Sequence, residues 1–98
     1  MKLLTKAIED KLAKFPLYSQ DGLPEKEVVV KFFNPMGAGR WFVTEGEKQD
    51  DGDWLFFGLV ELQEKEWGYF TLSQLQSVKL PFGMGIERDR NYKGKIAM

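Results

Sequence analysis

The chain has 98 residues and a formal net charge of −1, and it contains neither cysteine nor histidine. This composition excludes disulfides and thiolate metal sites, and it removes the commonest general base of enzymes. The length fits one α+β domain over residues 1–98, and a hydrophobic content of 43 % supplies one modest core. We therefore expect a protein that is not an enzyme and that carries no cofactor.

The charges are unevenly distributed along the chain. Residues 45–66 hold eight acids against two lysines, a local net charge of −6, whereas residues 79–98 hold five bases against two acids, a local net charge of +3. The two segments form either ordinary solvated surfaces or one bipolar binding surface. A pI of about 5.5 argues against a broad binder of nucleic-acid backbones, which needs a clear basic excess.

The N-terminal residues predict a helix rather than a signal peptide. Leu4, Ile8 and Leu12 recur at helical spacing, which predicts a helix over residues 5–14 with Thr5 as its N-cap, stopped by Pro16. Charged residues interrupt this stripe, and no segment is apolar over a length that spans a bilayer. We therefore expect a cytoplasmic protein that has no membrane partner.

Strands at hairpin spacing follow a polar loop over residues 17–26. In the second strand, strict alternation places Trp41, Val43 and Glu45 on one face of the sheet. The third strand is apolar on both faces, so we expect it to be central. The four strands are predicted at Glu27–Phe33, Arg40–Glu45, Trp54–Leu62 and Trp67–Phe70.

A short helix and a tail complete the chain. The helix is predicted over residues 71–77, with Thr71 or Ser73 as its N-cap. A short strand or turn is expected near Ile86, and residues 91–98 are expected to fray beyond an ordered core of residues 3–89. The fold predicted is an antiparallel meander of three to five strands, with an N-terminal helix and a short helix after the fourth strand, both packed on one face.

Six short blocks, in order and at their spacing, resemble one small family, the domain of unknown function 2958. The resemblance covers most of the chain, from about Leu3 to Asp89. It implies a bacterial or phage accessory protein carried by plasmids or conjugative elements, and it transfers no catalytic residues. The blocks are Leu3–Thr5, Val30–Pro35, Trp41–Glu45, Phe56–Val60, Gly68–Leu75 and Gly85–Asp89. The Gly-rich turn at residues 36–39 and the basic end at residues 90–95 depart from the family's pattern.

Carboxylates are the first candidates for chemistry. Asp50, Asp51 and Asp53 lie in one turn and could supply oxygen ligands to a hard cation, although a solvated hairpin turn explains them as well. Glu45 with Glu87 or Asp89 would be an acid and base pair only if their environments differed.

Cations and aromatics are the second group of candidates. Within the extended block at residues 87–90, the two acids would point one way and the two arginines the other, so Arg88 can pair with Glu45 or with an external carboxylate or phosphate. Tryptophans and tyrosines on successive strands are either core residues or, if exposed beside an arginine, a platform for stacking. The candidate binding residues are Arg40, Trp41, Glu45, Trp67, Tyr69, Glu87, Arg88 and Asp89.

Three functions are compatible with these residues. The first is a non-catalytic interaction module with a protein partner. The second is a binder of nucleotides or single-stranded nucleic acid that uses aromatics with Arg40, Arg88 and Arg90. The third is an enzyme that uses carboxylates and a divalent ion, which has the least support because no catalytic motif accompanies the acidic turn.

Overall fold

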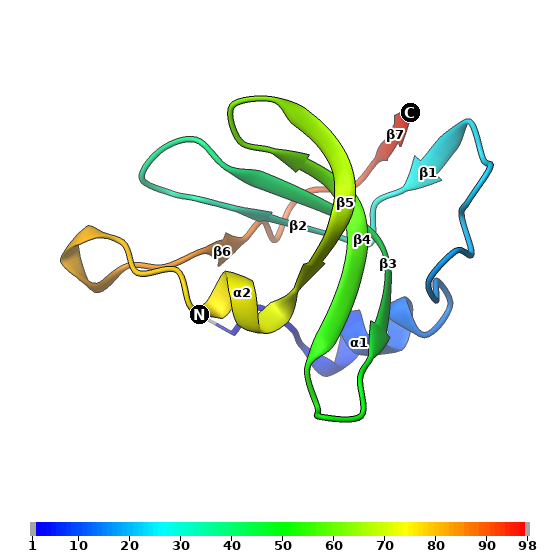
Figure 1. The fold of residues 1–98 in the computed structure, drawn as a ribbon, viewed down its shortest axis with the longest axis horizontal. Helices are drawn as coiled ribbons and strands as arrows, with labels where there is room; N and C mark the ends of the chain where they lie inside the picture. Colours follow the sequence, from blue (N-terminus) through cyan, green and yellow to red (C-terminus); the bar gives the residue numbers. More distant parts are fainter. Residues whose placement is uncertain (1, 98) are drawn as a thin grey trace.

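The computed structural model describes residues 2–97 (Figure 1). Its main sheet has five antiparallel strands in the order β5-β4-β3-β2-β6. The strands are Val30–Phe33 (β2), Arg40–Lys48 (β3), Trp54–Glu61 (β4), Lys65–Thr71 (β5) and Glu87–Arg88 (β6). β2 to β5 follow one another in the chain and in the sheet, which confirms the predicted α+β meander. β4 lies between two partner strands, as its apolar faces predicted.

Two short helices begin at side-chain caps. α1, Lys6–Leu12, follows Thr5, whose hydroxyl accepts the N–H of Ile8 at 3.3 Å. α2, Leu72–Gln76, follows Thr71, which forms a reciprocal capping box with Gln74, so the cap is Thr71 rather than Ser73. Residues 2–97 contain no helix with the length and apolarity to cross a membrane.

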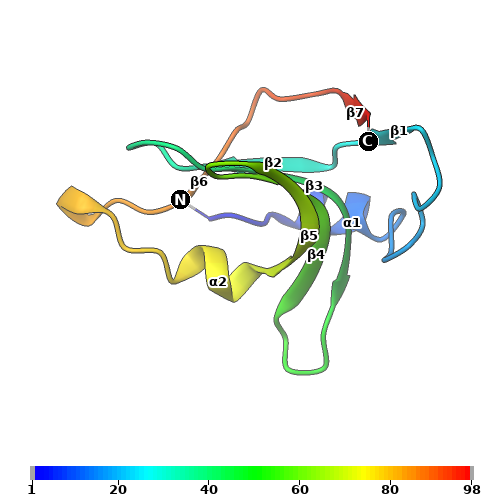
Figure 2. The ribbon, with the colours of Figure 1, turned by 45° about the horizontal axis from the view of Figure 1, so that its top comes forward.

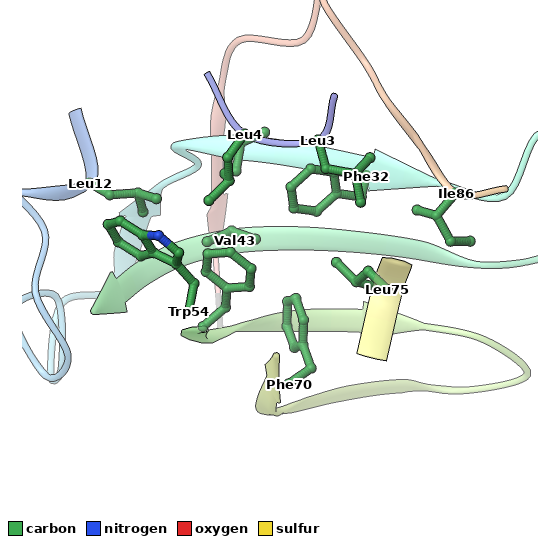
Figure 3. Close-up of a cluster of buried hydrophobic side chains, with 11 residues drawn as sticks. Leu3, Leu4, Leu12, Phe32, Val43, Trp54, Phe70, Leu75 and Ile86 are labelled. Atoms are coloured by element: carbon green, nitrogen blue, oxygen red, sulfur yellow. The ribbon is translucent and has the colours of Figure 1, made fainter. Parts of the chain in front are cut away.

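The helices cover one face of the sheet, which we call the inner face. Phe32, Phe56 and Phe70, from three strands, belong to one apolar cluster with residues of α2 and of the N-terminal segment. Figure 3 shows Phe32 and Phe70 among these side chains. Phe56 is fully buried, and its ring centroid lies 6.1 Å from that of Phe32 and 5.7 Å from that of Phe70. This apolar cluster is the main core, and it provides most of the hydrophobic stabilisation.

Part of the opposite, outer face is covered by a second, two-stranded sheet (Figure 2). It pairs β1, Glu25–Glu27, with β7, Lys95–Ala97. Ile96 and Tyr92 pack on a smaller apolar cluster formed by Val28, Phe42 and Leu59. β7 lies in the tail, where no strand was predicted, because its hydrogen-bonding partner is distant in sequence.

The first predicted strand, residues 27–33, was wrong as a single element. The chain changes partner in its middle: Val28 donates its N–H to Gly94 O, and Val29 donates its N–H to Val43 O. β1 therefore belongs to the small sheet and β2 to the main sheet. Val28 packs in the outer cluster and Val30 in the inner one, so each half of the segment contributes to a different core.

The predicted alternation of the second strand was also wrong, because β3 contains a β-bulge. Val43 pairs with Gly58 and Glu45 pairs with Phe57, which leaves Thr44 as the extra residue. Glu45 therefore shares the outer face with Phe57, whereas Val43 remains on the inner face. A Cβ at Gly58 would lie 1.9 Å from the carbonyl oxygen of Phe42, so only glycine fits beneath this part of β3.

Candidate functional site

An open cleft lies at the sheet edge formed by β2 and β6, between the β2–β3 turn and the chain that follows β6. Its volume is about 460 Å³. We call it the basic cleft because four of its lining side chains are cationic and one is a carboxylate. The described residues that line it are Lys31, Phe33, Asn34, Gly37, Gly39, Arg40, Arg88, Asp89, Arg90 and Asn91.

The β2–β3 turn builds one wall of the basic cleft. Asn34 closes the turn, because its Oδ1 accepts the N–H of Met36 and its Nδ2 donates to Ala38 O. Gly39 has φ +132°, and a Cβ there would lie 3.1 Å from the Trp41 ring, so glycine is required. The turn delivers Arg40 to the start of β3, with its side chain 61 % exposed.

Arg40 keeps its guanidinium available to solvent. Its Nη1 lies 3.8 Å from Glu61 Oε1 on β4, and the same carboxylate lies 3.8 Å from Lys65 Nζ. Such surface ion pairs contribute little free energy, so Arg40 can exchange this contact for a ligand at small cost.

β6 and the chain after it build the other wall. Arg88 donates through Nη1 to the carbonyl oxygens of Lys2 and Leu3, at 3.1 Å for Leu3. Through these two backbone carbonyls Arg88 ties the C-terminal segment to the N-terminal one, and its side chain also lines the cleft. The strand ends at Arg88, so Asp89 and the exposed Arg90 line the same cleft.

Lys31 neutralises the acid of the cleft. Its Nζ lies 3.5 Å from Asp89 Oδ2 and 5.4 and 5.2 Å from the ring centroids of Phe42 and Tyr92. This pair leaves the charge of the cleft to Arg40, Arg88 and Arg90, the three arginines that the nucleotide hypothesis had grouped. The guanidinium groups of Arg40 and Arg90 lie on opposing walls and suit an oxyanion, because such a group can donate two parallel N–H bonds to a carboxylate or phosphate.

A second, smaller hollow lies on the outer face, near the end of the sheet where β3 carries its bulge. It has a volume of about 110 Å³ and is lined by Tyr18, Asp21, Glu45, Phe57 and Tyr69. We call it the aromatic hollow. Glu45 is only 2 % exposed, and its two oxygens accept the backbone N–H groups of Tyr18 and Gln20 at 2.7 and 2.9 Å. Glu45 thus holds the loop after α1 against the sheet.

The eight candidate binding residues do not form one surface. Arg40, Arg88 and Asp89 line the basic cleft, and Glu45 and Tyr69 line the aromatic hollow. Trp41 packs on the inner core. Trp67 packs on the outer cluster and stacks on Phe57. Glu87 lines a third hollow, beside Lys2 and Leu3.

Sequence reasoning missed several lining residues. Lys31 and Phe33 belong to the Val30–Pro35 block, and the alternation of β2 could have placed both opposite the buried Phe32. Tyr18 had no comparable signal, because a loop without periodicity does not indicate which face of the sheet it crosses.

The acidic turn serves the fold. Asp53 accepts hydrogen bonds from the Ser73 hydroxyl at 2.6 Å, from Ser73 N at 3.1 Å and from Trp54 N at 2.8 Å, which joins the β3–β4 hairpin to α2. The Ser73 hydroxyl, helped by the two N–H groups and opposed by burial, lowers the pKa of Asp53. Asp51 accepts the N–H of Asp53. Within residues 2–97, neither Asp50 nor its neighbours belong to a group of three side chains placed to hold a metal.

Comparison with known proteins identifies the family of the chain. No curated protein and no solved structure matches it. One family model, described as "Protein of unknown function (DUF2958)", matches residues 3–98. The match spans nearly the full chain and agrees with the resemblance seen in the six sequence blocks. The chain belongs to the DUF2958 family.

Proposed function

We propose that this protein is a non-catalytic binding module whose basic cleft binds a short acidic segment of a protein partner. The observation that carries this proposal is the arrangement of Arg40, Arg88 and Arg90 around one open cleft in a protein of net charge −1. The cleft thus concentrates positive charge in a molecule whose net charge is slightly negative. We include in the proposal a cytoplasmic setting and the carriage by mobile elements that the resemblance implies.

The charge distribution favours a local ligand over a long polyanion. A nucleic-acid strand would extend beyond the cleft and meet the remaining surface, which carries the excess of acids in residues 45–66. A carboxylate side chain needs only the cleft, where an arginine can bind it bidentately. Asn34 and Asn91 in the lining can donate further hydrogen bonds to a peptide backbone.

A nucleotide is the second candidate ligand, and one observation favours it. Phe33 lines the basic cleft among the arginines and is not fully buried, so its ring can stack against a base while a guanidinium binds phosphate. A nucleotide, unlike a long strand, fits within a cleft of about 460 Å³.

A titration with three probes separates these ligands. A glutamate-rich peptide, ATP and a single-stranded oligothymidine are each titrated into the wild-type protein and into an Arg40→Gln/Arg90→Gln variant. The matched control is Lys14→Gln/Lys48→Gln, which removes the same charge from the turn after α1 and from the far end of β3. We expect the arginine variant to bind the peptide at least about tenfold more weakly, because two charge-assisted contacts are lost.

The outcomes decide between the candidates. Tightest binding of the peptide, lost only in the arginine variant, supports the acidic-segment proposal. Tightest binding of ATP shows that the cleft binds a nucleotide instead of an acidic segment. Equal weakening in both variants, or no binding of any probe to a folded protein, overturns the proposed function of the cleft.

A further inference from the structure

We propose that the aromatic hollow is a binding site for an alkylated ammonium group, such as the head of a methylated lysine or of a small quaternary amine. The hollow is separate from the basic cleft and has the opposite chemistry. Three aromatic rings and two carboxylates line it, and its described lining contains no lysine or arginine.

The walls of the hollow are rings that come from different elements. Phe57 on β4 and Tyr69 on β5 are cross-strand neighbours, with ring centroids 5.0 Å apart and planes inclined by 59°. Trp67 stacks on Phe57, with ring centroids 5.9 Å apart, and so restrains the Phe57 ring. Tyr18 adds the third ring from the loop after α1. Ring faces that meet at an angle form a corner that a cation can contact on more than one side.

The floor of the hollow is negatively charged. Glu45 is buried, and the groups that stabilise its carboxylate are the neutral N–H groups of Tyr18 and Gln20. Asp21 adds a second, exposed carboxylate at the rim. A hydrogen bond with Tyr18 raises the pKa of Tyr69, burial raises it further, and the negative charges of Glu45 and Asp21 act in the same direction. Two carboxylates thus lie beside the Tyr69 ring in the lining of one hollow, and their negative charge favours a cationic guest.

The backbone of Tyr18 is held in an uncommon conformation at this site. Its φ is +72°, in the left-handed region that an aromatic residue rarely adopts. The 2.7 Å bond from its N–H to Glu45 keeps it there, so the buried carboxylate positions the third wall. Tyr18 is nevertheless 67 % exposed and Tyr69 is 51 % exposed. The strained backbone of Tyr18 thus presents an exposed ring beside a buried carboxylate, and such strain clusters at binding sites rather than in cores.

Other cations already pack on rings of the same face. Lys31 Nζ lies 5.4 Å from the Phe42 ring centroid, and the buried Lys26 Nζ lies 6.0 Å from that of Trp67 while donating to Gln20 O and Leu23 O. In these places the protein supplies both the cation and the ring. In the aromatic hollow it supplies rings and carboxylates, and the cation would come from a ligand.

The hydrogen bonds of the hollow favour an alkylated ammonium over a primary one. Each buried Glu45 oxygen already accepts one N–H, so it has one lone pair left for the three donors of a primary ammonium, which would lose its water on entry. An alkylated ammonium has few or no donors to satisfy, and its methyl groups contact ring faces directly. A volume of about 110 Å³ holds such a head group but not a whole nucleotide or peptide.

The test measures binding to small cations by NMR or calorimetric titration of the full chain. Tetramethylammonium, methylammonium and choline are compared with 3,3-dimethyl-1-butanol, the uncharged carbon analogue of choline. We expect Tyr69→Leu to weaken binding of tetramethylammonium by about 2- to 30-fold, because it removes one ring face. Tyr69→Phe is the matched control, which keeps the ring and is expected to bind nearly as the wild type. Circular dichroism and thermal melting establish that both variants are folded.

Several results would overturn the site. They are equal affinity for choline and its uncharged analogue, an unchanged affinity in Tyr69→Leu, or tighter binding of methylammonium than of tetramethylammonium. A trimethyllysine peptide identifies the source of the cation: binding at least tenfold tighter than choline assigns a protein-borne methyl-lysine, and equal binding assigns a free quaternary amine. Because the basic cleft is unchanged in these variants, its own titration with acidic probes is unaffected by either result.

Discussion

The two faces of the sheet differ in what their buried side chains are. The inner face buries aliphatic and aromatic groups under two capped helices. The outer face, under the small β1–β7 sheet, buries Lys26 and Glu45, at 1 and 2 % exposure, beside an apolar cluster of three residues. An apolar core gains free energy from every group it removes from water, whereas a buried charge costs free energy unless its hydrogen bonds are satisfied.

From that difference we propose that the inner face provides stability and that the outer face provides recognition. On the outer face, Lys26 and Glu45 use carbonyl oxygens and N–H groups of one loop as their partners, so the charges order the loop that carries Tyr18. The aromatic hollow lies on this face. Lys31, which lines the basic cleft, packs on the ring of Phe42 on the same face. Buried polar groups and exposed rings on one face fit this proposal, because neither feature maximises packing.

The largest expected effect contrasts two neighbouring phenylalanines that lie on opposite faces. Phe56 is fully buried in the inner core, and Phe57 is half-buried on the outer face. Phe56→Ala is expected to lower the free energy of unfolding by about 3–5 kcal/mol, because it leaves a cavity among packed rings. Phe57→Ala is expected to cost about 1–2 kcal/mol, because less apolar surface is lost. Urea denaturation measures both, and equal costs would contradict the division between the faces.

A second, intermediate effect concerns the charge buried on the outer face. Glu45→Ala removes the acceptors of two backbone N–H groups, one of which is buried, and is expected to destabilise the protein by about 2–3 kcal/mol. The same variant is expected to speed hydrogen exchange at Tyr18 and Gln20, because the loop loses its anchor.

Glu47→Ala is the control for Glu45→Ala. Glu47 accepts the N–H of Leu17 in the same loop, but this contact is exposed to solvent. We expect a change below about 0.5 kcal/mol. If both variants cost the same, the burial of Glu45 is not what holds the loop.

Much of the inner face could be predicted from sequence, because the residue patterns that determine its helices and strands are local. The helical spacing of Leu4, Ile8 and Leu12, the caps at Thr5 and Thr71, and the glycine-containing turns each act within a few residues. Four of the five strands of the main sheet follow from such signals.

The outer face could not be predicted in the same way, because its organisation depends on contacts between distant residues. The bulge at Thr44 moves Glu45 to the other face, and it is matched by Gly58 on the neighbouring strand. β1 exists only because residues 95–97 return to pair with it. The nucleotide hypothesis grouped Arg40, Arg88 and Arg90 by their charge alone. Their place around one cleft, like the position of Tyr18 beside Tyr69, required the fold.

The smallest expected effect concerns the hydrogen bonds by which Asp53 fastens α2 to the β3–β4 hairpin. The pKa of Asp53 is lower in the folded protein than its ordinary value, first because of the Ser73 hydroxyl. A carboxyl with a lowered folded pKa stabilises the protein above its unfolded pKa, near pH 4, and this contribution is lost as the pH falls through the folded pKa. Asp53→Asn should therefore be less stable than the wild type at neutral pH, and the difference should shrink below about pH 4.

Urea denaturation between pH 2.5 and pH 7 measures this difference, and Asp50→Asn in the same turn is the matched control. Asp50 is exposed, and Asp53 is the residue of that turn whose carboxylate binds α2, so we expect the control to follow the wild type across the range. Ser73→Ala should reproduce the pH dependence of Asp53→Asn, because it removes the hydroxyl that chiefly lowers the pKa. A stability difference that stays constant with pH would show that Asp53 holds α2 through its shape and not through its charge. Ionised groups at this hairpin would then contribute nothing to the stability of the inner face.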